Sequence, residues 1–131
     1  MIKVRVISVP HNGTRSTMRI LREAGLDPNQ VHFTGKYVTS QIYDRHEPAI
    51  IPIRDKDKVR HSWARRGKSG TEFNLDEYWE EMEQYIDEHD NVYLLHIDDP
   101  ERRDAELSAI SELVGLPLEA DFSIKVGENG N

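Results

Sequence analysis

Residues 2–21 combine three local signals in one run, and this run limits the possible folds more than any other part of the chain. Ile2–Val9 is apolar and rich in β-branched residues, which predicts a buried strand. A turn is predicted at residues 10–13, and Thr14–Ala24 has apolar residues at helical spacing. A strand that turns into a helix N-terminus presents backbone N–H groups and the positive end of the helix dipole at one point. We therefore expect a phosphate or sulfate site at this loop.

The length and composition are those of one small domain. The chain has 131 residues and a formal net charge of −7, and we expect a single domain over residues 1–120 followed by a C-terminal tail over residues 121–131. An acidic chain lacks the broad positive field needed for general nucleic-acid binding or for binding to anionic membranes. Any anion site must therefore be local.

The same composition excludes several classes of chemistry. There is no cysteine, which excludes disulfides, thiolate zinc sites and thiol catalysis. No apolar run approaches the roughly 20 residues of a membrane span, and the first residues lack a signal-peptide pattern. We expect a soluble, cytoplasmic protein.

Strand and helix signals alternate along the rest of the chain. Strands are predicted at Val31–Val38, Ala49–Ile53 and Asn91–Ile97. Helices are predicted from Asp55 or Asp57 to about Arg66, after an N-cap at Asn74, and from Asp98-Asp99-Pro100 to Gly115. Such alternation predicts a three-layer α/β/α fold around a mainly parallel sheet of about four strands. The loop at residues 10–13 then lies at the carboxyl edge of the sheet, where open α/β sheets bind ligands.

The loop departs from a Walker A phosphate loop, G-x-x-x-x-G-K-[ST]. Gly13 is followed by Thr14 instead of a Lys, and Ser8 stands at the position of the first Gly. An ordinary ATPase or GTPase site is therefore not expected.

Three stretches resemble the sulfotransferase family. Pro10-x-x-Gly13-Thr14 resembles the family's phosphosulfate loop, usually written P-x-S-G-T-[TS]. Residues 50–63 resemble its 3′-phosphate motif, in which an Arg closes a strand and a Ser follows eight residues later, here Arg54 and Ser62. Residues 92–118 resemble its later strand, the helix that begins at Asp-Pro and the Gly-Leu-Pro ending. The resemblance covers roughly residues 2 to 120 and implies a short member with a P-loop NTPase-like fold.

The resemblance implies a nucleotide donor of sulfate, 3′-phosphoadenosine 5′-phosphosulfate, bound without a metal. Arg54 offers a planar fork of donors that matches a phosphate, and the Ser62 hydroxyl adds another donor. The other end of the nucleotide would lie against the loop and the first turn of the helix. The implied nucleotide-binding residues of this loop are Pro10, His11, Asn12, Gly13, Thr14, Arg15 and Ser16.

The resemblance also implies catalytic roles. The family often places a His about twenty residues before the phosphate-binding Arg, and His32 stands 22 positions before Arg54. His32 is therefore the first candidate for the base, with His46 second, and Lys36 is a further candidate for positioning the sulfate or acceptor. His11 replaces the Lys or Arg that commonly neutralises the leaving phosphate, so either a protonated His11 or Arg15 takes that role.

Several alternatives stay open at this point. The chain is short for the family, so the acceptor is small, a partner in a homodimer completes the pocket, or transfer has been lost. A P-loop kinase would need Arg15 in place of the missing Lys and Asp55 as a magnesium ligand. A non-catalytic nucleotide-binding module is a third function. The simplest alternative for Arg54 is an ion pair with Asp55 or another neighbouring acid.

Overall fold

The four strands of the chain form one parallel sheet. In a computed structural model, which describes residues 3–34, 47–65 and 74–118, the strand order is β2-β1-β3-β4 and every neighbouring pair is parallel. The strands are β1 (Arg5–Ser8), β2 (Asn29–His32), β3 (Ala49–Ile53) and β4 (Val92–His96). All four carboxyl ends therefore lie at the same edge of the sheet, as the alternation of strands and helices predicted.

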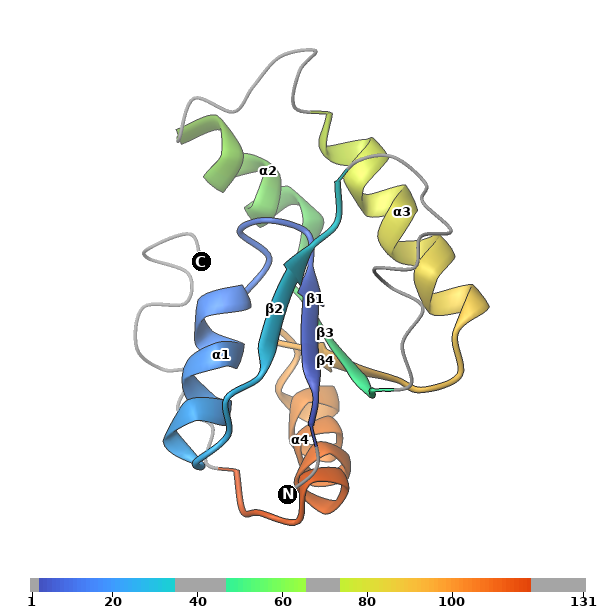
Figure 1. Ribbon diagram of the computed structural model, residues 1–131. Coiled ribbons are helices and arrows are strands. Elements are labelled where there is room, and N and C mark those ends of the chain that lie inside the picture. Colours follow the sequence, from blue (N-terminus) through green and yellow to red (C-terminus); the bar gives the residue numbers. More distant parts are fainter. Residues whose placement is uncertain (1–2, 35–46, 66–73, 119–131) are drawn as a thin grey trace.

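Helices cover both faces of this sheet (Figure 1). One buried cluster joins Val6 and Ile50 of the sheet to α1 and α4, and a second joins Ile7 and Ile51 to α2 and α3. Consecutive strand residues thus point to opposite layers, as the period of two in a strand requires. The helices are α1 (Thr14–Glu23), α2 (Lys56–Arg65), α3 (Leu75–Glu88) and α4 (Pro100–Val114). The α/β class with a four-stranded parallel sheet is confirmed, and the arrangement is compatible with three layers.

Local sequence signals explain where the helices begin and end. The Asn74 side chain accepts a hydrogen bond from the backbone N–H of Asp76 (3.0 Å), which caps α3. Asp99 caps α4 in the same way, with Pro100 as its first residue, and Gly115 ends it in a left-handed conformation (φ 71°). These predicted caps are confirmed.

The edge strand β2 begins and ends earlier than predicted. It spans Asn29–His32, whereas the sequence favoured Val31–Val38. Asn29 and Gln30 are exposed, so this strand lacks the apolar pattern that marks a buried one. Lys36, His46 and the predicted tail lie outside the described residues.

Pro52 lies inside β3, one residue before its end. The pairing of β3 with β1 stops at Val6 and Ile50, so no β1 acceptor faces the proline nitrogen.

No helix in the described part of the chain combines the length and apolar character that a membrane span requires.

Candidate anion site at the carboxyl edge of the sheet

The loop between β1 and α1 is a turn fixed by contacts to distant parts of the chain. His11 and Gly13 both have positive φ angles (64° and 85°), and the N–H of Asn12 donates to the carbonyl of Val9 (3.1 Å). The indole N–H of Trp63 on α2 donates to the carbonyl of Pro10 (2.7 Å). The loop is thus held by its own turn and by a hydrogen bond from α2, and it leads directly into α1.

Asn12 ties this loop to the end of β3. Its fully buried side chain donates from Nδ2 to the carbonyl of Pro52 (3.0 Å), and its Oδ1 accepts from the backbone N–H of Arg54 (2.7 Å). The position of Asn12 in the loop predicted only a nucleotide contact, and no local sequence pattern predicted this bridge. The bridge fixes the backbone of Arg54 beside the loop.

Gly13 is the point of closest approach between the loop and the strands behind it. A Cβ atom at this position would overlap Cδ1 of Ile97 and lie 3.5 Å from Cγ of Arg54. The left-handed backbone and the absence of a side chain are therefore both required here. A branched residue at Gly13 would therefore disturb the core at Ile97 as well as obstruct an anion at the loop.

Within the described residues, no side chain caps the backbone N–H groups at the start of α1. Gly13 is the N-cap and supplies no side-chain hydrogen bond, and no acidic residue lies in the first turn. The backbone N–H of Thr17 and its hydroxyl both donate to the carbonyl of Gly13 (3.1 and 3.0 Å). The N–H groups of residues 14–16 precede that first helical bond, so they carry the partial positive charge of the helix end toward any ligand at the loop.

Arg54 is a buried cation with unused donors. Its exposed fraction is 3%, and among the described residues its Nε and Nη1 atoms have no hydrogen-bond partner. Burial lowers the pKa of its guanidinium below the usual value, while the Asp98 carboxylate acts in the opposite direction. A buried cation of this kind destabilises the folded state unless an anion pairs with it and accepts its hydrogen bonds.

The neighbouring acid of Arg54 is Asp98, which follows β4. Arg54 Nε lies 3.9 Å from Asp98 Oδ2, while the same carboxylate accepts from the N–H of Asp55 (2.8 Å) and lies 3.6 Å from Lys58 Nζ. The simple ion-pair interpretation of Arg54 is thus correct in part, but the pair is long and shared. Asp98 was predicted only as part of a helix start.

Ser62 is placed less favourably than its spacing predicted. It is fully buried on the side of α2 that also buries Val59 and Trp63. A phosphate would reach this hydroxyl only after a change in packing, so the 3′-phosphate role of Ser62 stays a prediction.

His32 is the last residue of β2, so it lies at the same edge of the sheet as Gly13 and Arg54. It pairs with Ser8 in the β1–β2 register, and its Nδ1 is 3.4 Å from the Ser8 hydroxyl. That hydroxyl is 2.6 Å from the Thr14 hydroxyl at the start of α1. A polar chain therefore leads from the exposed His32 ring through Ser8 to the loop. In the sequence, Ser8 is marked only by its departure from the Walker A pattern.

The other predicted residues lie in the β1–α1 loop and in the first turn of α1. Arg15 and Ser16 occupy the first turn of α1, where Arg15 is exposed and Ser16 is buried. Pro10 and His11 are half-buried in the loop. The structure thus gathers the predicted loop residues, Arg54 and His32 at one edge.

Comparison with known proteins gives no identification. No protein-family model matches the chain, and a search of curated proteins finds no match.

Proposed function

We propose that the carboxyl edge of the sheet binds a nucleotide with two separate anionic groups, and that the chain is a sulfotransferase-like protein with a P-loop NTPase-like arrangement. One observation carries the proposal: the buried guanidinium of Arg54, whose Nε and Nη1 atoms have no hydrogen-bond partner among the described residues, is on a side chain whose Cγ lies beside Gly13 of the β1–α1 loop. A cation in this state favours a ligand that brings a negative charge to it. The uncapped first turn of α1 supplies a second place for an anion.

Two anion sites suit 3′-phosphoadenosine 5′-phosphosulfate. Arg54 would hold the 3′-phosphate, and the N–H groups of residues 14–16 would hold the 5′-phosphosulfate. The resemblance of residues 10–16 and 54–62 to the sulfotransferase motifs supports this orientation. No magnesium ion is needed, because the positive charge comes from Arg54 and the helix end.

The proposed reaction is transfer of a sulfuryl group to a hydroxyl or amine. The acceptor oxygen or nitrogen attacks the sulfur, the bond between the sulfur and the 5′-phosphate oxygen breaks, and adenosine 3′,5′-bisphosphate leaves. His32 takes the acceptor proton, since its exposed ring is linked to Thr14 through Ser8. Protonated His11 or Arg15 would stabilise the leaving phosphate.

The kinase alternative is less well supported. Its magnesium ligand, Asp55, has a structural role: Oδ1 accepts from the N–H groups of Asp57 (2.9 Å) and Lys58 (3.4 Å) at the start of α2. A carboxylate engaged in capping a helix is less available to a metal ion. Nucleotide binding without catalysis stays the third alternative.

Calorimetric titration with adenosine 3′,5′-bisphosphate, AMP and ATP, each with and without magnesium, tests the proposal. We expect the bisphosphate to bind most tightly and magnesium to have no effect on it. Tightest binding of ATP, and only with magnesium, would favour the kinase. Failure of all three ligands to bind would contradict nucleotide binding.

A further inference from the structure

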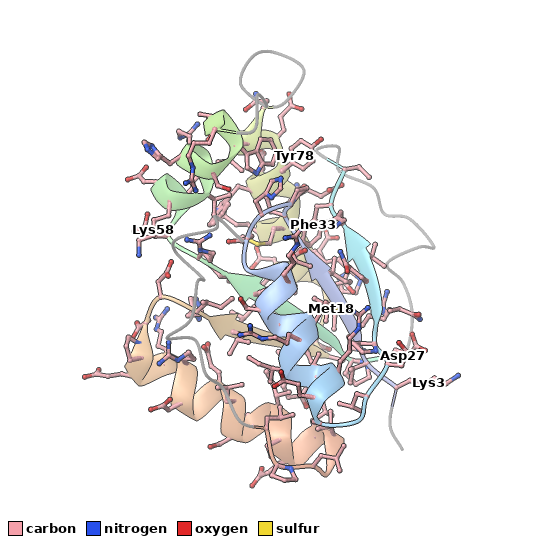
Figure 2. All side chains as sticks on the ribbon, turned by 90° about the vertical axis from the view of Figure 1, so that its left-hand side faces the viewer. Lys3, Met18, Asp27, Phe33, Lys58 and Tyr78 are labelled. Atoms are coloured by element: carbon pink, nitrogen blue, oxygen red, sulfur yellow. The ribbon has the colours of Figure 1, made fainter. Side chains whose placement is uncertain are left out.

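The basic residues of α2 lie on two different flanks of the helix. Lys56 and Arg60 both form ion pairs with Asp76 of α3 (2.9 and 3.0 Å). Lys58 instead lies 3.6 Å from Asp98, which follows β4, and Figure 2 shows Lys58 on the side of α2 away from α3. One flank of α2 is therefore turned toward α3, and the other toward the carboxyl edge of the sheet.

Arg65 belongs to the same flank as Lys58. Lys58, Ser62 and Arg65 recur at the four- and three-residue steps that share one side of a helix. Ser62 is fully buried, whereas Lys58 and Arg65 are exposed. Within the part of the chain that the structure describes, no acid forms an ion pair with Arg65. Arg65 therefore adds a cation to this flank that no described acid neutralises.

This flank of α2 lies beside the buried guanidinium of Arg54. Asp98 lies 3.6 Å from Lys58 Nζ and 3.9 Å from Arg54 Nε, so it connects the two cations. Burial lowers the pKa of Arg54, Asp98 raises it, and the nearby charge of Arg65 lowers it again. Among the described residues, three cations thus lie around two carboxylates, Asp98 and Asp55, and Asp55 also caps α2. Cations that repel one another are stabilised by an anion that pairs with each of them.

We infer that Arg54 and this flank of α2 together hold one phosphate monoester of the ligand. Lys58 and Arg65 are its exposed contacts, and Arg65 supplies the contact from α2 that was expected of the buried Ser62 hydroxyl. A phosphate monoester carries close to two negative charges at neutral pH, because its second pKa is about 6, whereas a diester carries one. An excess of cations favours the doubly charged group. Resting on the proposed function, this assigns the 3′-phosphate of the nucleotide to Arg54, Lys58 and Arg65.

Two double variants, one for each flank of α2, test the assignment. Lys58→Gln/Arg65→Gln should weaken binding of adenosine 3′,5′-bisphosphate about five- to tenfold, as expected for the loss of two partly exposed ion pairs. Lys56→Gln/Arg60→Gln is the matched control, because it removes the same two charges from the same helix on the flank that pairs with Asp76. Calorimetry measures the affinities at one salt concentration, and circular dichroism checks that each variant is folded. An affinity of the first variant equal to that of the parent or of the control would overturn the inference.

Adenosine 3′-phosphate and its methyl ester test the preference for a doubly charged group. The parent and the control variant should bind the monoester more tightly than the methyl diester. Lys58→Gln/Arg65→Gln should lose most of this preference, because the two exposed cations that favour the second charge are gone. Equal binding of the two ligands by the parent would contradict the assignment.

Inorganic pyrophosphate separates this inference from the proposed function. If adenosine 3′,5′-bisphosphate does not bind to the parent, nucleotide binding is wrong, and titration of the parent and the two double variants with pyrophosphate still tests the cation cluster. Weaker pyrophosphate binding in Lys58→Gln/Arg65→Gln alone would support a phosphate site without a nucleotide. Equal affinity in all three proteins, or no binding to the parent, would overturn the cluster as a phosphate site.

Discussion

The two edges of the sheet each contain a buried arginine, and the two arginines differ in what surrounds them. Arg5 begins β1 at the amino edge, and its Nη2 donates to the Tyr85 hydroxyl (3.3 Å) and the carbonyl of Glu47 (3.4 Å). Its Nε makes only a long ion pair, 3.8 Å from a Glu47 carboxylate oxygen. Arg54, at the carboxyl edge, has a similarly long ion pair from Nε, but its Nη1 has no hydrogen-bond partner among the described residues. At similar burial, the Nη atoms of Arg5 bind groups of the fold, whereas in the proposed function the donors of Arg54 bind a ligand.

Two further pairs of residues repeat this difference. Gly13 and Gly25 both have positive φ, but a Cβ at Gly25, on the amino side, would have no atom within 4 Å. His89, also on the amino side, stacks on Tyr85 with ring centroids 3.9 Å apart, whereas His32 is exposed and connects to the loop. Each pair supplies a variant at the proposed site and a matched control at the opposite edge.

The largest expected effect concerns the histidines. His32→Ala should lower sulfuryl-transfer turnover about 10²–10⁴-fold, the usual range for a positioned general base. Nucleotide affinity should hardly change, because the ring is not a proposed nucleotide ligand. The measurement is steady-state turnover with an aryl acceptor, compared with His89→Ala as the control. Equal losses of turnover in the two variants would assign both histidines to the fold.

The glycines should differ in folding stability. Gly13→Ala should lower the free energy of unfolding by about 2–5 kcal/mol, from left-handed backbone strain together with overpacking against Ile97. Gly25→Ala should cost only the strain, about 1–2 kcal/mol. Urea unfolding of both variants checks this. Adding Ile97→Val, which removes the overlapping Cδ1, should restore part of the loss at Gly13, and no coupling between the two changes would contradict the packing argument.

The arginines should separate stability from binding. Arg5→Met should destabilise the fold by about 1.5–3 kcal/mol through lost charge-assisted hydrogen bonds, with nucleotide affinity unchanged. Arg54→Met should leave stability between unchanged and about 2 kcal/mol higher, because it removes a poorly paired buried cation. The same variant should weaken binding of adenosine 3′,5′-bisphosphate by about 1.5–3 kcal/mol and that of AMP far less. If Arg54→Met is destabilised and still binds adenosine 3′,5′-bisphosphate with normal affinity, Arg54 stabilises the fold and is not a nucleotide ligand.

The smallest effect is expected at an exposed ion pair of the carboxyl side. Hydrogen bonds from Lys56 and Arg60 hold the pKa of Asp76 below its usual value. The charged carboxylate therefore stabilises the native state above about pH 4, and this contribution is lost as the pH falls through the native pKa. Asp76→Asn should lower the melting temperature by no more than a few degrees at pH 7, and the difference should vanish at low pH or in high salt. Asp27→Asn, at the amino edge, is the control.

Local rules were sufficient to predict much of this fold. The strand-to-helix run at the N-terminus, the Asn74 cap and the Asp99-Pro100 start with its Gly115 end all follow from residues close together in the sequence. The carboxyl-edge position of the loop and of Arg54 follows from parallel strands alone, whereas the predicted strand Val31–Val38 would have placed His32 near its start. These predictions needed no knowledge of strand order.

The properties that make Arg54 a candidate ligand depend on strand order. β3 lies between β1 and β4, which places Asn12, Arg54 and Asp98 together although they are far apart in the sequence. No local pattern reports that Asn12 bridges to β3 or that Asp98 is shared with Asp55 and Lys58. The start of β2 was missed for a related reason, since an exposed edge strand has little apolar pattern to detect.

The most direct test follows the Nε–H resonances of the two arginines by ¹H–¹⁵N NMR during titration with adenosine 3′,5′-bisphosphate. Arg5→Met and Arg54→Met assign the two signals, because each variant lacks one of them. The account predicts that the Arg54 signal shifts and exchanges more slowly with water as the nucleotide binds, while the Arg5 signal does not move. An unchanged Arg54 signal at a nucleotide concentration that calorimetry shows to be saturating would contradict the claim that this buried cation holds the ligand.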